Sequence, residues 1–240
     1  MSAVSADAIA SHRATILENV ARAAGKSHRD PSAIALMAVT KGQSAETVAN
    51  AARAGLTRFG ENRVQEGVSK IEGVRSSFPG LEWRLIGPLQ TNKARTALQY
   101  FQVLESLDRE RLATRLESLL AAQEPARVWP VLLEINVGGE PSKSGVLPDA
   151  AAGLLEAARA CPHLSVRGLM AVPPYADDPE ASRPHFRALA SLRDALSSRF
   201  ALPLPELSMG MSHDYAVAVE EGATEIRVGT ALFGPREARP

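Results

Sequence analysis

The sequence has a single cysteine, Cys161, in 240 residues, and aromatic side chains make up only 5% of the chain. One thiol can form no internal disulfide and cannot supply a cysteine cluster for a metal ion, so we interpret Cys161 as a small buried hydrophobic residue and expect no metal site. Net charge is also lacking, because 27 Lys and Arg residues balance 27 Asp and Glu residues. A balanced chain creates no field that would attract nucleic acid or an anionic membrane, so any anion site must be local.

Long hydrophobic runs are also missing. No segment approaches the roughly 20 apolar residues of a membrane span. The first 25 residues contain His12, Arg13 and Glu18 where a signal peptide would have an unbroken apolar segment. We therefore expect a cytoplasmic protein that makes no membrane contact. No repeat, low-complexity tract or long linker divides the sequence, which predicts one domain over residues 1–240.

Short apolar segments alternate with amphipathic segments along the whole chain. The segments between the apolar runs have helical spacing, as in the helix predicted from Ser44, in the capping position, to Gly55, a typical helix end. Eight strands are predicted, over residues 33–40, 57–61, 83–87, 101–106, 130–136, 166–172, 206–210 and 225–234.

Strand and helix alternating eight times, in a chain near the roughly 250 residues typical of the architecture, predict an α/β fold of the (β/α)8 type, a TIM barrel. An additional helix is expected over residues 5–24, before the first strand. The alternative is an open, doubly wound sheet. That fold would need fewer strands, or a glycine-rich phosphate turn after the first strand, where the sequence has TKGQS in place of GxGxxG.

The ends of the last two predicted strands have the features of an anion site. Ser212 follows the seventh strand and precedes a predicted short helix ending at Gly222, and Gly229 and Thr230 lie in the eighth strand. Hydroxyl groups and the N–H groups of a helix N-terminus stabilise anions, and barrels commonly hold phosphate with the loops after strands 7 and 8. The alternative is that Ser212 only caps its helix and that Gly229 only relieves packing.

Two cations are predicted at the same end of the barrel. The parity of the eighth strand points Arg227 into the barrel, where its charge needs either an internal ion pair, with Glu61 or Glu225, or a ligand. Lys41 ends the first strand, and a partly desolvated lysine can attack an aldehyde and form a Schiff base. Alone, Lys41 would be a solvated strand-end lysine. Together with a phosphate site and Arg227, it matches the groups expected around pyridoxal 5′-phosphate (PLP).

Seven motifs follow one another between about residue 36 and residue 234: AVTK, FGEN, IGPLQTNK, NVGGEPSKSG, RGLMAV, LSMGMSHD and IRVGTALFG. In this order they resemble the pyridoxal phosphate homeostasis proteins, stand-alone relatives of the N-terminal barrel of alanine racemase. The resemblance implies that PLP is linked to Lys41, with its phosphate at Ser212, Gly229 and Thr230. It also implies that Arg227 lies near the pyridine nitrogen, and Asn62 resembles the family's strand-2 residue beside the cofactor.

The same resemblance implies a function. The family is described as binding PLP and acting in vitamin B6 balance without a firmly established catalytic activity. We therefore expect a monomeric PLP carrier that has no catalytic residues and whose partners include PLP-requiring apoenzymes. Where the family often has a second lysine, this chain has Gln43, which leaves Lys143 as the obvious additional amine near the barrel mouth.

The alternative function is a PLP-dependent amino-acid racemase. Two-base racemisation needs a proton acceptor on each face of the bound substrate, and Lys41 can serve only one face. In alanine racemases the second acceptor is a tyrosine from an added β-domain, whereas this sequence ends within a few residues of the last predicted strand. Among the three tyrosines, Tyr175 is the candidate replacement. An arginine at the ring nitrogen also leaves that nitrogen unprotonated, which disfavours transaminase or decarboxylase chemistry.

Overall fold

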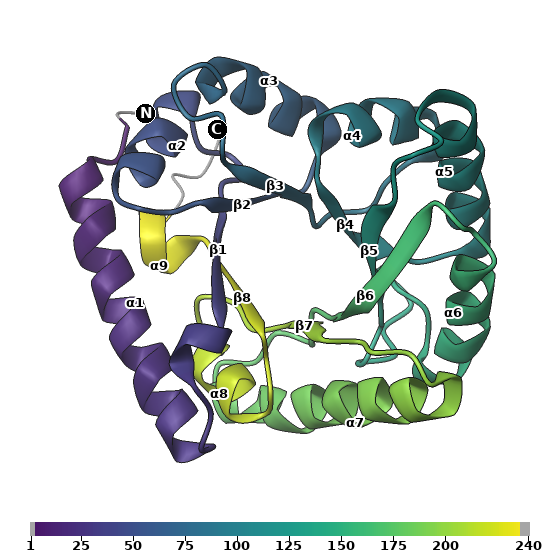
Figure 1. The fold of residues 1–240 in the computed structure, drawn as a ribbon. Coiled ribbons are helices and arrows are strands. Elements are labelled where there is room, and N and C mark those ends of the chain that lie inside the picture. Colours follow the sequence, from purple (N-terminus) through teal and green to yellow (C-terminus); the bar gives the residue numbers. More distant parts are fainter. Residues whose placement is uncertain (1–2, 236–240) are drawn as a thin grey trace.

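The computed structural model describes residues 3–235 and contains a closed barrel of parallel strands in chain order (Figure 1). The last strand pairs with the first, with Met37 opposite Arg227, so the sheet closes and the open-sheet alternative is excluded. The strands are β1 (Ala35–Val39), β2 (Arg58–Glu61), β3 (Glu82–Leu85), β4 (Val103–Leu107), β5 (Trp129–Glu134), β6 (Leu164–Met170), β7 (Glu206–Ser208) and β8 (Glu225–Val228).

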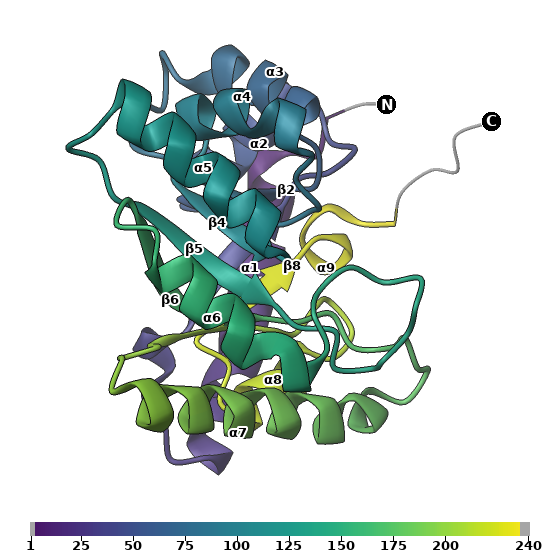
Figure 2. The ribbon, with the colours of Figure 1, turned by 90° about the vertical axis from the view of Figure 1, so that its right-hand side faces the viewer.

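Helices form a ring outside the strands, and Figure 2 shows α5, α6 and α7 on one side of this ring. None of the helices within residues 3–235 has both the length and the apolar character needed to cross a membrane. The α-helices are α1 (Ala6–Lys26), α2 (Ala45–Arg53), α3 (Val64–Val74), α4 (Ala94–Tyr100), α5 (Glu110–Gln123), α6 (Ala151–Arg159), α7 (Arg183–Phe200), α8 (Tyr215–Glu220) and α9 (Thr230–Phe233). Short 3₁₀ helices cover Pro31–Ala33, Thr91–Lys93, Pro148–Ala150 and Pro179–Ser182.

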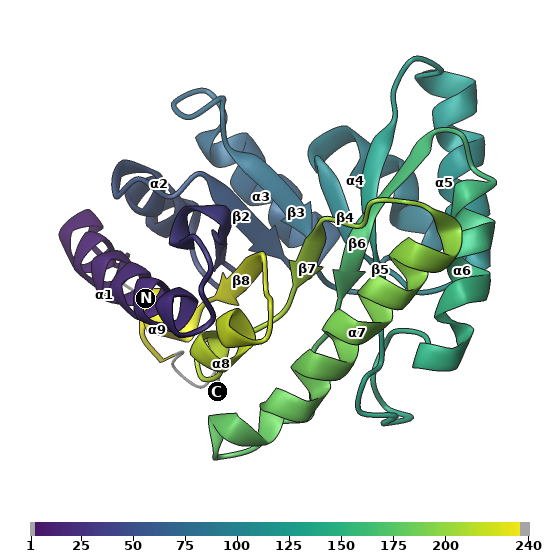
Figure 3. The same ribbon diagram turned by 60° about the horizontal axis from the view of Figure 1, so that its bottom comes forward.

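The predicted additional helix is α1, which completes the outer ring beside the short helices α8 and α9 (Figure 3). Its N-terminus is capped by Ser5, whose hydroxyl oxygen accepts the N–H of Ala8. The Asn19 amide donates to the hydroxyl of Tyr215 on α8, at 2.9 Å. Because α8 and α9 are too short to cover the strands alone, α1 buries the apolar surface that they leave open.

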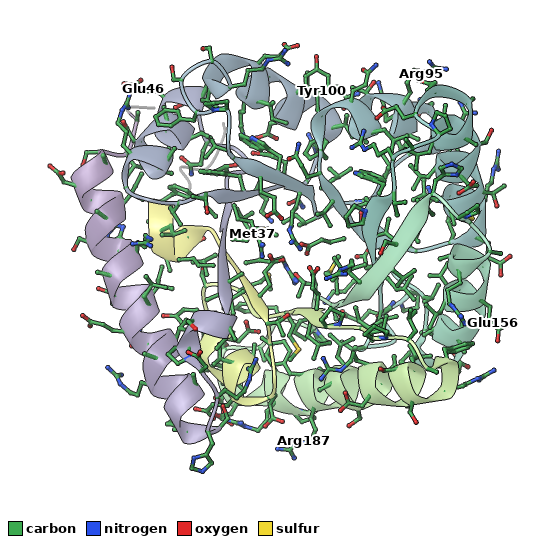
Figure 4. All side chains as sticks on the ribbon, in the orientation of Figure 1. Met37, Glu46, Arg95, Tyr100, Glu156 and Arg187 are labelled. Carbon is green, nitrogen blue, oxygen red and sulfur yellow. The ribbon has the colours of Figure 1, made fainter. Side chains whose placement is uncertain are left out.

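Two interiors of different character lie on the two sides of the sheet. Between strands and helices the packing is apolar, as in the stacked rings of Phe59 and Trp83, whose centroids are 5.2 Å apart. Cys161 is buried on this side, which confirms its interpretation as a core residue. Inside the ring of strands, where Met37 lies (Figure 4), Val103, Leu132 and Met170 form a second, small apolar cluster. Buried charged residues of the strands include Arg84, Glu105, Glu225 and Arg227.

The prediction of a strand over residues 225–234 is wrong in its second half. β8 ends at Val228, and residues Thr230–Phe233 form α9. At Gly229 the backbone (φ −116°, ψ −76°) leaves the extended region, and its carbonyl accepts the N–H groups of Leu232 and Phe233. A short apolar run fits a buried strand or a buried helix equally well, so the sequence pattern could not locate this boundary.

Candidate functional site

A cavity of ≈ 310 Å³ lies where the loops leave the carboxyl ends of β1, β2, β7 and β8. All six residues selected from the sequence contribute to its lining: Lys41, Asn62, Ser212, Arg227, Gly229 and Thr230. The fold therefore brings together residues that are up to 189 positions apart in the chain, from Lys41 to Thr230. Their role in holding a cofactor stays a prediction, which the geometry of each residue informs.

Ser212, Gly229 and Thr230 form one corner of the cavity. The Ser212 hydroxyl oxygen accepts the N–H groups of Gly229, at 3.2 Å, and of Ala231, at 3.1 Å. A serine hydroxyl also has one proton that it can donate. Ser212 thus caps the start of α9, and the alternative that it caps α8 is wrong. The residue preceding α8 is Asp214, whose carboxylate accepts the Met211 N–H at 2.7 Å.

Asn62 is held by a close backbone contact. A Cβ atom added to Gly87 would lie 2.2 Å from the carbonyl oxygen of Asn62, so only glycine lets the loop after β3 approach the loop after β2. The side-chain oxygen of Asn62 is buried and has no hydrogen-bond partner within residues 3–235. Buried polar atoms normally have a partner, so this oxygen is an acceptor suited to a ligand in the cavity.

Arg227 points into the barrel, as its parity predicts, while Ile226 and Val228 pack in the outer core. Arg227 is 3% exposed, and its guanidinium donates to the Ser208 hydroxyl, at 2.8 Å, and to the Ala171 carbonyl, at 2.7 Å. The alternative of an internal ion pair between Arg227 and Glu61 or Glu225 is wrong. Glu61 pairs with Lys70 on α3, and the Glu225 carboxyl lies 2.6 Å from the guanidinium of Arg58.

Ser208 connects Arg227 to two buried carboxyl groups. Its hydroxyl lies 2.6 Å from Glu105 Oε2 and 3.1 Å from Glu225 Oε1. The hydroxyl accepts from Arg227 and has one proton to donate, so both carboxyl contacts are satisfied only when one carboxyl carries a proton. Burial and the Glu105 charge raise the pKa of Glu225 to about 8, so we place that proton on Glu225.

Sequence reasoning missed a cluster behind Lys41, formed by Lys70 on α3 with Glu61 and Glu66. Lys70 lies 2.7 Å from a carboxylate oxygen of each glutamate. The i, i+4 spacing of Glu66 and Lys70 is visible in the sequence, but this pattern is typical of solvent-exposed helix pairs. Only the fold shows that Lys70 is buried and that its amine faces the loop carrying Lys41.

The remaining candidates lie at or beyond the mouth of the cavity. Tyr175 contributes to the lining, is 78% exposed, and has its ring 5.9 Å from that of His213. Lys143 is not part of the lining; it pairs with Glu140 and donates to the Pro173 carbonyl at 3.0 Å. Lys143 therefore lies near the loop after β6, as predicted, but does not line the cavity itself.

Residues 11–237 match the family model described as "Alanine racemase, N-terminal domain". A protein of Pseudomonas aeruginosa named pyridoxal phosphate homeostasis protein is 43% identical over 233 residues, covering 93% of this chain and 96% of that protein. One of Aquifex aeolicus with the same name is 42% identical, covering 92% and 96%. The solved structure of PipY from Synechococcus elongatus with PLP bound is 36% identical, covers 90% of this chain and 100% of that one, and has a TM-score of 0.78.

Proposed function

This chain belongs to the alanine racemase N-terminal domain family and, within it, to the pyridoxal phosphate homeostasis proteins, and from that membership we propose that it binds PLP in the cavity and acts in PLP homeostasis. The proposal rests mainly on the combination of polar groups in one cavity. A lysine amine, an anion corner and a buried guanidinium are the groups that PLP requires, and a relative 36% identical has been solved with PLP bound.

Lys41 is the residue proposed to hold PLP covalently. Its amine would hold PLP through a reversible Schiff base to the aldehyde of the cofactor. When bound, PLP supplies a reactive aldehyde and a ring that accepts electrons. Lys41 is the only one of the six selected lining residues that has a primary amine in its side chain.

The other residues divide the remaining polar groups of PLP among them. Ser212 and Thr230 offer hydroxyl groups to the phosphate, and Gly229, whose N–H donates to Ser212, lines the cavity beside them without a side chain. The Asn62 oxygen is an acceptor for a hydroxyl group of the ring. Arg227 faces the ring nitrogen and cannot easily give up a proton, so the ring stays a weak electron sink. This weakness favours a carrier over a carbanion-forming enzyme.

The covalent link is tested by trapping it. Purified protein incubated with PLP and reduced with borohydride is expected to carry the added mass on the peptide containing Lys41. Lys41→Ala abolishes the adduct, and the control Lys143→Ala retains it. Circular dichroism checks that Lys41→Ala is folded. An adduct that persists in Lys41→Ala, on another lysine, would contradict the assignment.

Racemisation is the second candidate, favoured by the two side chains at the mouth that could accept a proton, Tyr175 and His213. Incubating the protein with PLP and L-alanine in deuterated water separates the two functions. A carrier leaves the Cα proton in place. Exchange over many turnovers, reduced by Tyr175→Phe or His213→Gln, would replace the carrier proposal with a racemase.

Release to other proteins completes the proposed role. Because the link is reversible, we propose that PLP passes to PLP-requiring apoenzymes in the cytoplasm and that the carrier acts as a monomer. Exposed large hydrophobic side chains within residues 3–235 are few, namely Val128, Leu147, Val172 and Tyr175, and the last two belong to the cavity lining, which supports the monomer. Light scattering measures the mass, and reactivation of an apoenzyme by the loaded protein measures transfer.

A further inference from the structure

The backbone on both sides of Lys41 is anchored to helix α3. The Lys70 amine donates to the carbonyl of Thr40, the residue before Lys41, at 2.5 Å. The Glu66 carboxylate accepts the N–H of Gly42, the residue after Lys41, at 2.5 Å. The Lys70 amine also donates to the Glu66 carboxylate at 2.7 Å, so a single ion pair holds the peptide groups on both sides of Lys41 by hydrogen bonds.

Glu61 adds a third anchor from β2. Its Oε1 accepts the Thr40 hydroxyl at 2.5 Å and the Lys70 amine at 2.7 Å. A lysine amine has three protons to donate, and here Thr40, Glu61 and Glu66 take one each. All three N–H groups of the Lys70 amine therefore have an acceptor. These hydrogen bonds fix the position of the loop after β1.

We propose that Lys70, with Glu61 and Glu66, is the positioning group that holds Lys41 in place to attack the PLP aldehyde, an inference that rests on the proposed function. Lys41 carries its amine on a flexible stem of four carbons, so the direction of attack depends on a fixed backbone. Covalent steps are sensitive to misplacement of about 1 Å, which can cost about 100-fold in rate.

The character of the cluster also indicates a positioning role. Buried ion pairs are a weak source of stability, because the cost of removing both charges from water offsets their attraction. Lys70 is 5% exposed and Glu61 is fully buried, yet their hydrogen bonds converge on the residue beside Lys41. Lys70, Glu61 and Glu66 lie outside the cavity lining, and their hydrogen bonds reach the backbone on both sides of Lys41, which is part of it.

The test separates attachment from binding by using two probes. Attachment of PLP to Lys41 is followed over time by borohydride trapping and mass spectrometry. Pyridoxamine 5′-phosphate shares the ring and phosphate but has an amine in place of the aldehyde, so its affinity reports the rest of the site. A positioning role predicts slower attachment with an unchanged affinity for pyridoxamine 5′-phosphate.

The variants are chosen so that no buried charge loses its partner. The double variant Lys70→Met with Glu61→Gln removes both charges and keeps an acceptor for the Thr40 hydroxyl. Glu66→Ala removes the anchor of Gly42, and Glu72→Ala, an exposed glutamate on the same helix, is its matched control. We expect attachment about 10- to 100-fold slower in the first two variants and unchanged in Glu72→Ala.

The outcomes are distinguishable. Attachment at the wild-type rate in folded variants overturns the positioning role, as does an equal loss of affinity for both probes. If thermal melting shows that the double variant is unfolded, Glu66→Ala decides. Wild-type protein that binds pyridoxamine 5′-phosphate but attaches no PLP would refute the proposed function itself, a different result from normal attachment in the variants.

Discussion

Arg227 owes its position to a hydroxyl rather than to a carboxylate. The guanidinium is held by Ser208 and by the carbonyl of Ala171, and Ser208 separates it from Glu105 and Glu225. A direct ion pair would direct the guanidinium toward the carboxylate and away from the cavity. The intervening hydroxyl keeps the positive charge available to a ligand at the barrel mouth.

Removing that hydroxyl tests the arrangement. Ser208→Ala deletes one hydrogen bond to Arg227, worth about 1 kcal/mol, so we expect the dissociation constant for PLP to rise about fivefold. Fluorescence titration measures this constant. Ser197→Ala, which removes a hydroxyl bonded to the Leu202 carbonyl at the end of α7, is the control and leaves PLP affinity unchanged. Equal affinities in both variants would show that Ser208 does not support Arg227.

The sequence was sufficient to select the site residues that lie at strand ends. Lys41, Asn62 and Arg227 could be selected because parallel strands of a barrel bring their carboxyl ends to one face. Lys70 could not, because it lies in mid-helix with the spacing of an ordinary surface pair. Its function depends on which loop the helix packs against, and a single sequence does not contain that information.

The strands were predicted more accurately than the segments that follow them. Eight strands were predicted and eight are found within residues 3–235, each displaced by only a few residues at its ends, except for β8. The sequence predicts strand number well because each buried strand is a separate apolar run. It does not predict α9, since the short and mostly apolar run Thr230–Phe233 fits a buried strand as well as a buried helix. The backbone changes from strand to helix at Gly229.

The close contact between the loops after β2 and β3 can be tested by mutation. Gly87→Ala would place a methyl group 2.2 Å from the Asn62 carbonyl and push the loops after β2 and β3 apart. We expect a loss of about 1–3 kcal/mol in the free energy of unfolding, measured in urea, together with weaker PLP binding. Gly80→Ala is the control, because an added Cβ there meets nothing within 4 Å. Comparable stabilities of the two variants would show that the contact can relax without cost.

For the whole molecule, the decisive feature is a barrel interior filled with charge. Arg84 is 4% exposed and lies 3.1 Å from Glu105 and 2.8 Å from Glu206. Three buried glutamates, Glu105, Glu134 and Glu225, face two buried arginines, Arg84 and Arg227, so the interior cannot hold every carboxylate in its charged form at low cost. Burial and the nearby Asp108 charge raise the pKa of Glu134 to about 7.

These raised pKa values determine how stability depends on pH. A carboxyl that keeps its proton in the folded state but loses it on unfolding favours unfolding as pH rises from its unfolded pKa to its folded pKa. For Glu225 the folded pKa is about 8 and for Glu134 about 7, against an ordinary value of 4.5. The free energy of unfolding is therefore expected to fall between about pH 5 and pH 8 and to level off above.

Glu225→Gln isolates the contribution of the largest shift. The amide has the shape of the protonated carboxyl and cannot ionise, so the variant loses up to about 1.4 kcal/mol per pH unit of the slope between about pH 5 and pH 8. Urea unfolding across that range measures both slopes. Glu156→Gln, on the outer surface (Figure 4), is the control and retains the wild-type slope. If Glu225 were ionised in the folded protein, its charge would stabilise the fold through Arg58, and Glu225→Gln would be less stable than wild type by the same amount at every pH above 5.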